Sequence, residues 1–149
     1  MEGLIKIEFP KDCVQVRNAN NRQEIFCVIR KEWLLLTPEE WVRQHVIQFL
    51  ISYGYPSSLI SVEKKISLPN NLTKRCDIVI YDRNARPFMI IECKRMETDL
   101  SEKVLNQVLR YHIPLQPTYL IITNGLFTMG FKKERNRFIP AGSFPSFPV

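Results

Sequence analysis

The chain has 149 residues, and its 21 Lys and Arg residues against 15 Asp and Glu residues give a formal net charge of +6. Hydrophobic residues make up 45% of the chain and charged residues 24%, an ordinary globular composition that excludes a largely disordered protein. The sequence has neither the roughly 20 consecutive apolar residues of a membrane-spanning helix nor the apolar run of a signal peptide, so we expect a cytoplasmic, single-domain protein with no membrane partner.

The first 36 residues are expected to form an N-terminal β extension. Apolar runs at residues 4–9, 25–29 and 33–36 are typical of short strands. The Asn-rich segment 17–22 between them has the composition of a turn. The four cysteines contain no C-x-x-C pair and lie far from both histidines in the sequence, so they predict reduced, packed side chains and no zinc site.

A helix is predicted over residues 38–53. Thr37 can cap its first free N–H groups, Pro38 suits the first helical position, and Glu40 completes a capping box. Apolar residues then recur at helical spacing as far as Tyr53, and Gly54 ends the pattern.

The rest of the chain alternates between strand and helix patterns. Strands are expected at residues 59–68, 75–82, 87–94 and 118–123, a helix at 101–112, and a loose, basic and Pro-rich surface tail from residue 132. The loop between 82 and 87 makes a hairpin of its two flanking strands. This order predicts an α/β fold with one mixed sheet between helices.

The strand over 87–94 carries Glu92 and Lys94 two residues apart, and residues two apart on a strand share a face. If a symmetric hairpin pairs Asp82 with Pro87, the same register sets Asp77 directly opposite Glu92. The two carboxylates would then lie within about 5 Å at their Cβ atoms, a separation that favours a cation between them. The pattern predicts a site for a hard divalent cation such as Mg²⁺, with Lys94 beside it.

An ordinary surface ion pair is the alternative interpretation of these charges. Both strands of the hairpin are apolar on both faces, which predicts that they are central and covered. Charges at the end of such a hairpin are costly unless they have a use, so we favour the functional interpretation.

A third acid is expected from the first helix. At about 100° per residue, Glu39 lies within the arc of the apolar positions Val42 and Val46, whereas Glu40 points away from that arc. Glu40 also has a structural explanation in the capping box, so Glu39 is preferred as the site residue. The choice between the two acids stays open at this point.

Gln107 and Tyr111 lie one turn apart on the second helix and share a face beside its apolar stripe. They could bond a phosphate or a metal ligand, or they could be rim residues of a packed helix. The basic run at 132–137 is likewise explained equally well by phosphate contacts and by a solvated tail.

Five segments in this order resemble the PD-(D/E)XK nuclease superfamily, and most of all the N-terminal nuclease domain of type I restriction enzyme R subunits and its short, stand-alone bacterial relatives. They are residues 36–44 (LTPEEWVRQ), 75–79 (RCDIV), 91–94 (IECK), 107–111 (QVLRY) and 123–125 (TNG). The resemblance runs from about residue 25 to residue 127.

The resemblance implies a restriction-endonuclease-like α/β core, a mixed β-sheet flanked by helices, at residues 37–127. Residues 1–36 would be the β extension and 128–149 a C-terminal tail. It implies that carboxylates and a backbone carbonyl hold Mg²⁺, for which Mn²⁺ can substitute, and that Lys94 is the catalytic lysine. The catalytic residues so implied are Asp77, Glu92, Lys94, Glu39, Gln107 and Tyr111, and the metal ligands are Asp77, Glu92, Cys93 through its carbonyl, and Glu39.

Two departures from the family pattern limit what the resemblance implies. Cys76 stands where the superfamily name has Pro, a position that varies within the superfamily. An R subunit also carries helicase domains after its nuclease, which 149 residues cannot include, so translocation along DNA is not implied.

The expected function is therefore Mg²⁺-dependent endonucleolytic hydrolysis of DNA phosphodiester bonds in restriction, repair or defence. The positive charge agrees weakly with a polyanionic partner. Other restriction or defence subunits and a second copy of the chain are further expected partners. The alternative is a nucleic-acid-binding or partner-binding module that keeps the nuclease fold without cleaving.

Overall fold

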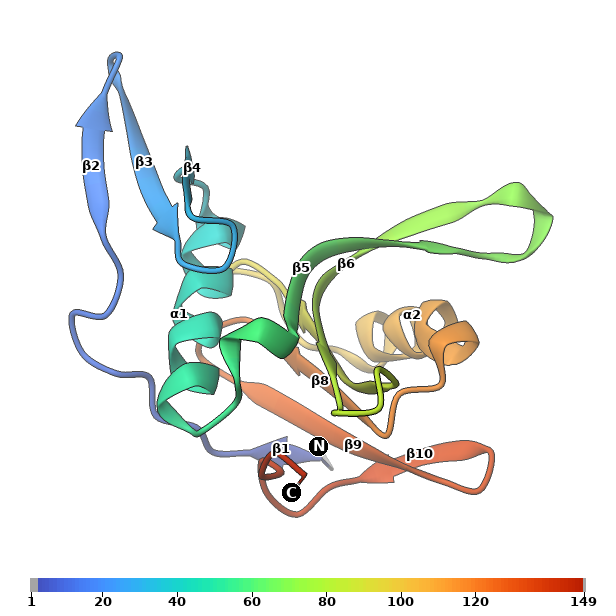
Figure 1. Cartoon of the computed structure of the whole chain (residues 1–149). Coiled ribbons are helices and arrows are strands. Elements are labelled where there is room, and N and C mark those ends of the chain that lie inside the picture. The colour runs from blue at the N-terminus through green and yellow to red at the C-terminus, as the bar shows by residue number, and fades with distance from the viewer. Residues whose placement is uncertain (1–2, 149) are drawn as a thin grey trace.

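The computed structural model describes residues 3–148, apart from the side chains at 111–113. Two sheets form in this part of the chain (Figure 1): a seven-stranded sheet in the order β1-β9-β8-β7-β6-β5, with β10 also paired to β9, and a separate three-stranded sheet in the order β2-β3-β4. The elements are β1 (Leu4–Ile5), β2 (Val16–Ala19), β3 (Arg22–Cys27), β4 (Glu32–Leu35), α1 (Pro38–Ser52), β5 (Ile60–Ser67), β6 (Thr73–Tyr81), β7 (Pro87–Cys93), α2 (Glu102–His112), β8 (Tyr119–Thr123), β9 (Thr128–Glu134) and β10 (Arg137–Pro140), with short 3₁₀ turns at Ser57–Leu59, Pro69–Asn71 and Ile113–Leu115.

The large sheet is mixed and has a helix on each face. β7 and β8 are parallel and are joined through α2, whereas the other neighbouring strands are antiparallel. One face packs against α1 through Ile78, Ile80 and Ile91. The opposite face packs through Val79 and Ile90 against a cluster that includes residues of α2. The predicted α/β fold with a mixed sheet between helices is confirmed at this level.

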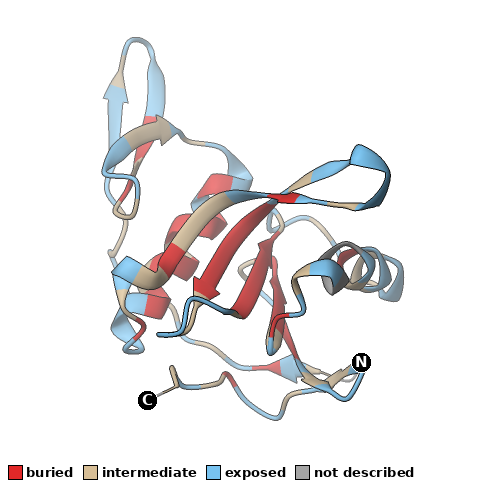
Figure 2. Ribbon diagram, turned by 45° about the vertical axis from the view of Figure 1, so that its right-hand side comes forward, coloured by how far each residue is buried: buried red, intermediate tan, exposed pale blue. Residues whose placement is uncertain are grey.

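Burial follows from the composition of the central strands. Figure 2 shows the buried residues gathered in these strands and on α1, and exposed residues at the tips of the β2–β3 and β5–β6 hairpins. Ile78, Val79, Ile80, Ile90 and Ile91 are all fully buried. Strands that are apolar on both sides need a cover on both faces, so the β6–β7 hairpin is central, as predicted.

The start of α1 agrees closely with the sequence. The helix begins at Pro38, and the Thr37 hydroxyl oxygen accepts a hydrogen bond from the Glu40 N–H at 3.0 Å. Tyr53, predicted as its last residue, is instead the C-cap. The Glu40 carboxylate does not complete the expected capping box and turns toward Arg43 and Gln44 instead.

The N-terminal extension contains strands, but segment 17–22 is not a simple turn, so that prediction is wrong. β2 and β3 run through it as an antiparallel hairpin in which Ala19 pairs with Arg22. Only Asn20 and Asn21 form the connection, and both have positive φ, 54° and 63°. Two-residue hairpin connections require such backbone angles and favour Asn.

The prediction of a loose tail from residue 132 is also wrong. β9 pairs with β8 along one edge, and its other edge is shared by β1 and β10. Met129 and Phe131 are buried in the sheet, and Phe144 packs against Phe49 of α1 with ring centroids 5.0 Å apart. The first four residues of β9, from Thr128 to Phe131, are buried, and pairing with neighbouring strands on both edges holds the segment in the sheet despite its basic and Pro-rich continuation.

The outer part of the β5–β6 hairpin projects beyond the sheet (Figure 1). The β6–β7 pairing ends at Ile78 opposite Ile91, while the β5–β6 pairing continues outward to Ser67 opposite Thr73. We call residues 64–76 the β5–β6 arm. Its base lies where β6 leaves the sheet, one residue before Asp77.

Candidate active site

The hairpin register predicted from the sequence is present in the body of the β6–β7 ladder. Ile78 lies opposite Ile91 and Ile80 opposite Met89, so one further step along the same register sets Asp77 opposite Glu92. The predicted pair of Asp82 with Pro87 is wrong, because a bulge next to the turn pairs Pro87 with Tyr81.

Asp82 accounts for this local difference. Its carboxylate accepts hydrogen bonds from the N–H groups of Asn84 and Arg86, at 2.8 and 3.0 Å. An Asp side chain that bonds its own turn in this way competes with regular strand pairing. The bulge absorbs the difference within one residue, so the register farther along the ladder is unaffected.

Asp77 is held from two sides. One carboxylate oxygen, Oδ2, accepts the backbone N–H of Cys93 at 2.8 Å, and the other, Oδ1, accepts from Arg43 Nη2 at 2.8 Å. The residue is only 8% exposed. Burial and then the nearby charge of Glu92 raise the pKa of Asp77 to about 7, although Arg43 and the Cys93 N–H oppose that rise.

Glu92 is also buried, and a different cation accompanies it. Lys74 Nζ, on the β5–β6 arm, lies 3.8 Å from Glu92 Oε2.

Burial and then the charge of Glu92 raise the pKa of the Cys76 thiol to about 12. A thiol with so high a pKa is protonated at neutral pH, which argues against Cys76 as a nucleophile.

Arg43 is the site residue that sequence reasoning missed. Besides Asp77, its guanidinium contacts Glu40 at 2.6 Å, Glu39 at 3.3 Å and Glu63 at 3.6 Å. Burial opposes its charge, but the charges of Asp77 and Glu40 outweigh burial and raise the pKa of Arg43 further above its ordinary value. Its spacing of three and four residues from Glu40 and Glu39 was the available signal.

The two helix acids lie the other way round from the prediction. The Glu39 side chain is 48% exposed, and that of Glu40 is 10% exposed. The predicted arc omitted a second buried stripe on α1, in which Glu40 lies one turn before Arg43 and Gln44. The prediction that Glu39 lies on the buried face of the helix is therefore wrong. The role of Glu39 as a metal ligand stays a prediction.

Lys94 directly follows β7 and is fixed through its backbone. Its N–H donates to the Thr123 carbonyl at 2.8 Å, in the T-N-G segment. Asn124, itself buried, donates from Nδ2 to the Thr98 carbonyl at 2.9 Å and accepts the N–H of Leu126 and of Phe127. The T-N-G segment therefore holds the chain on both sides of the loop that starts with Lys94.

Gly125 completes this turn. Its φ is +89°, a value that L side chains rarely adopt, and a Cβ there would approach Val42 Cγ2 of α1 to 3.3 Å. Both observations favour glycine at this position.

The second helix carries the two residues predicted to assist, Gln107 and Tyr111. Gln107 is exposed on α2, while its neighbour Val108 is buried against the sheet. The Tyr111 side chain lies outside the described residues. The assisting roles of Gln107 and Tyr111 therefore stay predictions.

A cleft of about 550 Å³ opens beside the Arg43 cluster. Three acidic and three basic side chains line it: Glu39, Glu40, Glu63, Arg30, Arg43 and Arg95. The cleft reaches Asp77 only through Arg43, which contacts Asp77 at 2.8 Å.

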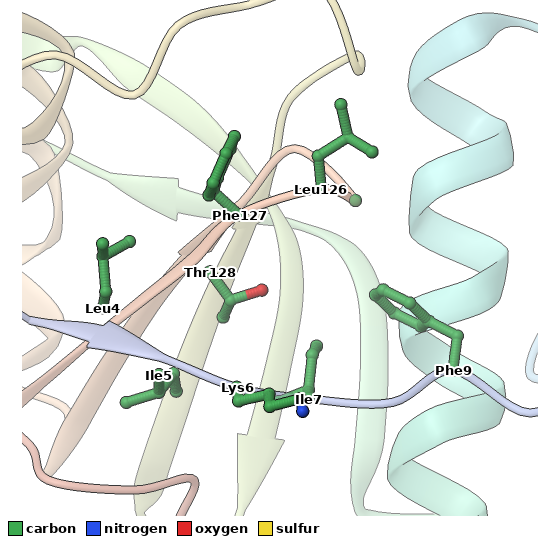
Figure 3. Close-up of a pocket in the computed structure, with 9 residues that line it drawn as sticks. Leu4, Ile5, Lys6, Ile7, Phe9, Leu126, Phe127 and Thr128 are labelled. Carbon is green, nitrogen blue, oxygen red and sulfur yellow. The ribbon is translucent and has the colours of Figure 1, made fainter.

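Another hollow, of about 370 Å³, has a different character (Figure 3). The close-up shows Leu4, Ile7 and Phe9 around it, together with Leu126 and Phe127 from the turn before β9. Its lining residues include Lys6 but no acid. It lacks the carboxylates that a metal site needs, so the Asp77 region is the better candidate.

A comparison with known families identifies the chain. The family model described as the type I restriction enzyme R protein N terminus matches residues 38–145. The chain belongs to this family. A comparison with curated proteins gave no match.

The bounds of the match follow the fold of this R-protein N-terminal domain. It begins at Pro38, the first residue of α1, and continues through β9 and β10. The terminal strands that the sequence reading assigned to a tail therefore fall within the family domain. β1 and the β2-β3-β4 sheet precede the match.

The donors of this R-protein N-terminal domain can be compared with what a hard cation needs. Within the described residues, no group of three or more His, Cys, Asp and Glu side chains is arranged to hold a metal ion. Mg²⁺, however, keeps several waters and usually takes only one or two carboxylates. Asp77 and Glu92 supply two, so the donor set fits Mg²⁺.

Among the residues that the structure describes, neither helix has the length and apolar composition of a membrane span.

Proposed function

We propose that this chain is a Mg²⁺-dependent endonuclease that hydrolyses DNA phosphodiester bonds, with Asp77, Glu92 and Lys94 as its central residues. The observation that carries the proposal is the register of the β6–β7 ladder, which, continued one step beyond the pair of Ile78 with Ile91, sets the buried Asp77 opposite the buried Glu92. Lys94 follows Glu92 by two residues. Membership of the restriction R-protein family supports a nuclease-related role. A restriction-endonuclease-like core is part of the proposal.

The energetics of the two acids support a cation between them. Both residues are buried, with side chains 11% and 4% exposed, and a buried charge is costly unless it is paired. The pKa of Asp77 is raised to about 7 by burial and by the charge of Glu92, even with Arg43 in contact. A divalent cation would offset both effects, and the Cys93 carbonyl and Glu39 are proposed as further oxygen ligands.

The chemistry divides among the residues as follows. When bound, Mg²⁺ would polarise the scissile phosphate and favour ionisation of an attacking water. Asp77 and Glu92 would hold the ion, and the Cys93 N–H fixes the Asp77 carboxylate for that task. Lys94 would orient the attacking water and stabilise the charge that develops on the phosphate. Gln107 and Tyr111 would bind the phosphate from α2.

DNA is the proposed substrate, and other restriction or defence subunits are proposed partners. Assembly with a second copy of the chain is a further proposal, since nucleases that cut both strands commonly use two copies related by symmetry.

A cleavage assay tests the function. Supercoiled and single-stranded DNA are incubated with the wild type, Asp77→Ala and Lys94→Ala in Mg²⁺, Mn²⁺ or EDTA. Asp99→Ala and Lys11→Ala, at exposed positions outside the site, are matched controls. We expect cutting that needs the metal, disappears in both site variants and persists in both controls. Equal cutting by Lys94→Ala and the wild type would contradict the proposed mechanism.

A non-cleaving DNA-binding module is the alternative, and one observation favours it. Arg43 already donates to Asp77 Oδ1 and gives the buried carboxylate a cation of its own. If the folded wild type binds DNA but neither cuts it nor binds Mg²⁺, this alternative replaces the nuclease.

A further inference from the structure

The β5–β6 arm carries an unusual concentration of charge. Residues 64–76 contain four basic residues, Lys64, Lys65, Lys74 and Arg75, and no acidic one. The net charge of the arm is therefore +4, whereas the whole chain has a net charge of +6. The composition of this projecting ribbon suits an anionic partner.

The two faces of the arm differ. Ile66 and Cys76 are buried and belong to the cluster on the α2 side of the sheet, and Leu68 packs against that cluster. This packing supports one face of a ribbon that would be marginal alone, since a two-stranded hairpin is barely stable in water.

The opposite face has no apolar residue at its paired positions. Lys65 lies directly opposite Arg75, and Ser67 directly opposite Thr73. All four residues are exposed. Lys, Arg, Ser and Thr side chains are the ones that bond phosphate oxygens along a nucleic-acid backbone.

The pairing of Lys65 with Arg75 is unfavourable for the free protein. Like charges directly opposite each other on neighbouring strands destabilise a hairpin. Arg75 has a partner at its inner end, Glu63 at 3.9 Å, but its side chain is still 55% exposed. An anion lying across the ribbon would offset the repulsion between the two cations.

This face leads directly into the candidate active site. Thr73, Arg75 and Asp77 follow one another at every second position of β6. Contacts run from Arg75 through Glu63 to Arg43 and so to Asp77. Arg75 is therefore about 6.7 Å along the strand from Asp77, and each DNA strand places a phosphate about every 3.4 Å along the helix axis.

We propose that the β5–β6 arm binds the DNA backbone, with Lys65 and Arg75 holding phosphates next to the one positioned at Asp77. Ser67 and Thr73 extend the contact toward the tip. The inference rests on the proposed function and adds to it the surface along which the substrate approaches.

Binding of a short fluorescein-labelled DNA duplex, measured by anisotropy in EDTA over a series of salt concentrations, tests the inference. The variant is Lys65→Gln/Arg75→Gln. The control, Arg135→Gln/Arg137→Gln, removes the same charge from the exposed β9–β10 hairpin. We expect the arm variant to lose about tenfold in affinity and its slope of log K against log salt to fall by about 2. The control should keep its affinity within about twofold of the wild type.

Stability separates this role from a structural one. Because the substitution removes a repulsion, the arm variant should melt at the wild-type temperature or above it. An unchanged affinity in the arm variant, or an equal loss in the control, would overturn the inference even if the wild type cuts DNA. A wild type that neither binds nor cuts DNA would overturn the proposed function as well.

Discussion

The inner and outer halves of β6 differ in strand pairing and in burial. In the inner half, Ile78 to Ile80 pair with strands on both sides and are fully buried. In the outer half, Thr73 to Arg75 pair only with β5, and Thr73 and Arg75 are exposed. The inner half is a buried base, and the outer half is a charged ribbon.

Asp77 lies at the junction between the two halves. Pairing with β7 stops after Ile78, which leaves the Cys93 N–H without a strand partner from β6. The Asp77 carboxylate accepts this N–H instead. A backbone donor released where the ladder ends thus orients an acid, while the buried strands beside it fix the position of both groups.

The largest expected effect comes from removing an acid at this junction. Glu92→Gln keeps the size of the side chain but removes its charge, and it should lower metal-dependent cleavage by about 10³-fold. Glu134→Gln, an exposed acid on β9, is the control. The initial rate on supercoiled DNA is the measurement, and a Glu92→Gln rate within about tenfold of the wild type would separate Glu92 from the chemistry.

The polar cluster beside the base should show the largest effect on stability. Arg43→Met removes the only cation that contacts Asp77 and Glu40 among the ion pairs of the described residues. Loss of one partner from a buried ion pair costs about 3–5 kcal/mol, and the free energy of unfolding from urea titration measures it. Arg135→Met, at an exposed turn, should be nearly neutral. A loss below about 1 kcal/mol at Arg43 would mean that the cluster is solvated.

Asn124 ties the loop that follows β7 to the turn that follows β8. Asn124→Ala removes three hydrogen bonds of a buried side chain, to Thr98, Leu126 and Phe127. It should destabilise the protein by about 2 kcal/mol, because the backbone groups left behind are only partly solvated. Thermal unfolding of the variant against Asn84→Ala, an exposed turn position, is the measurement. Equal melting temperatures would show that water replaces the Asn124 side chain.

The smallest effect is a slope in the pH dependence of stability. Burial and the charge of Glu92 raise the pKa of Asp77 to about 7, whereas the pKa of an Asp in an unfolded chain is about 3.9. Between these values the folded protein binds more protons than the unfolded chain, so stability falls as pH rises. In EDTA, the free energy of unfolding should fall by roughly 1 kcal/mol per pH unit from pH 5 to 7. The slope should be smaller in Asp77→Asn, and equal slopes would assign the titration to another group.

The sequence was most informative where local pattern and tertiary structure agree. Thr37 and Pro38 start α1 where predicted, since a capped helix start depends on neighbouring residues alone. The register that sets Asp77 opposite Glu92 was also predictable from the short loop between the two strands, because the bulge at Tyr81 leaves the rest of the ladder in the predicted register.

It was least informative where partners come from distant parts of the chain. Glu40 belongs to a second buried stripe of α1, together with Arg43 and Gln44. The helical arc defined by Val42 and Val46 alone did not include that stripe. β9 was missed because its basic residues suggested a tail, although β8, β1 and β10 together complete its pairing. No single segment carries that information.

The central proposal is that Asp77 and Glu92 together hold a divalent cation. Electron paramagnetic resonance of free Mn²⁺, titrated with the folded wild type and with Asp77→Asn, counts the bound ions directly. We expect a bound Mn²⁺ in the wild type that Mg²⁺ displaces and that Asp77→Asn lacks. Equal binding by the two proteins, or none by the folded wild type, would contradict it.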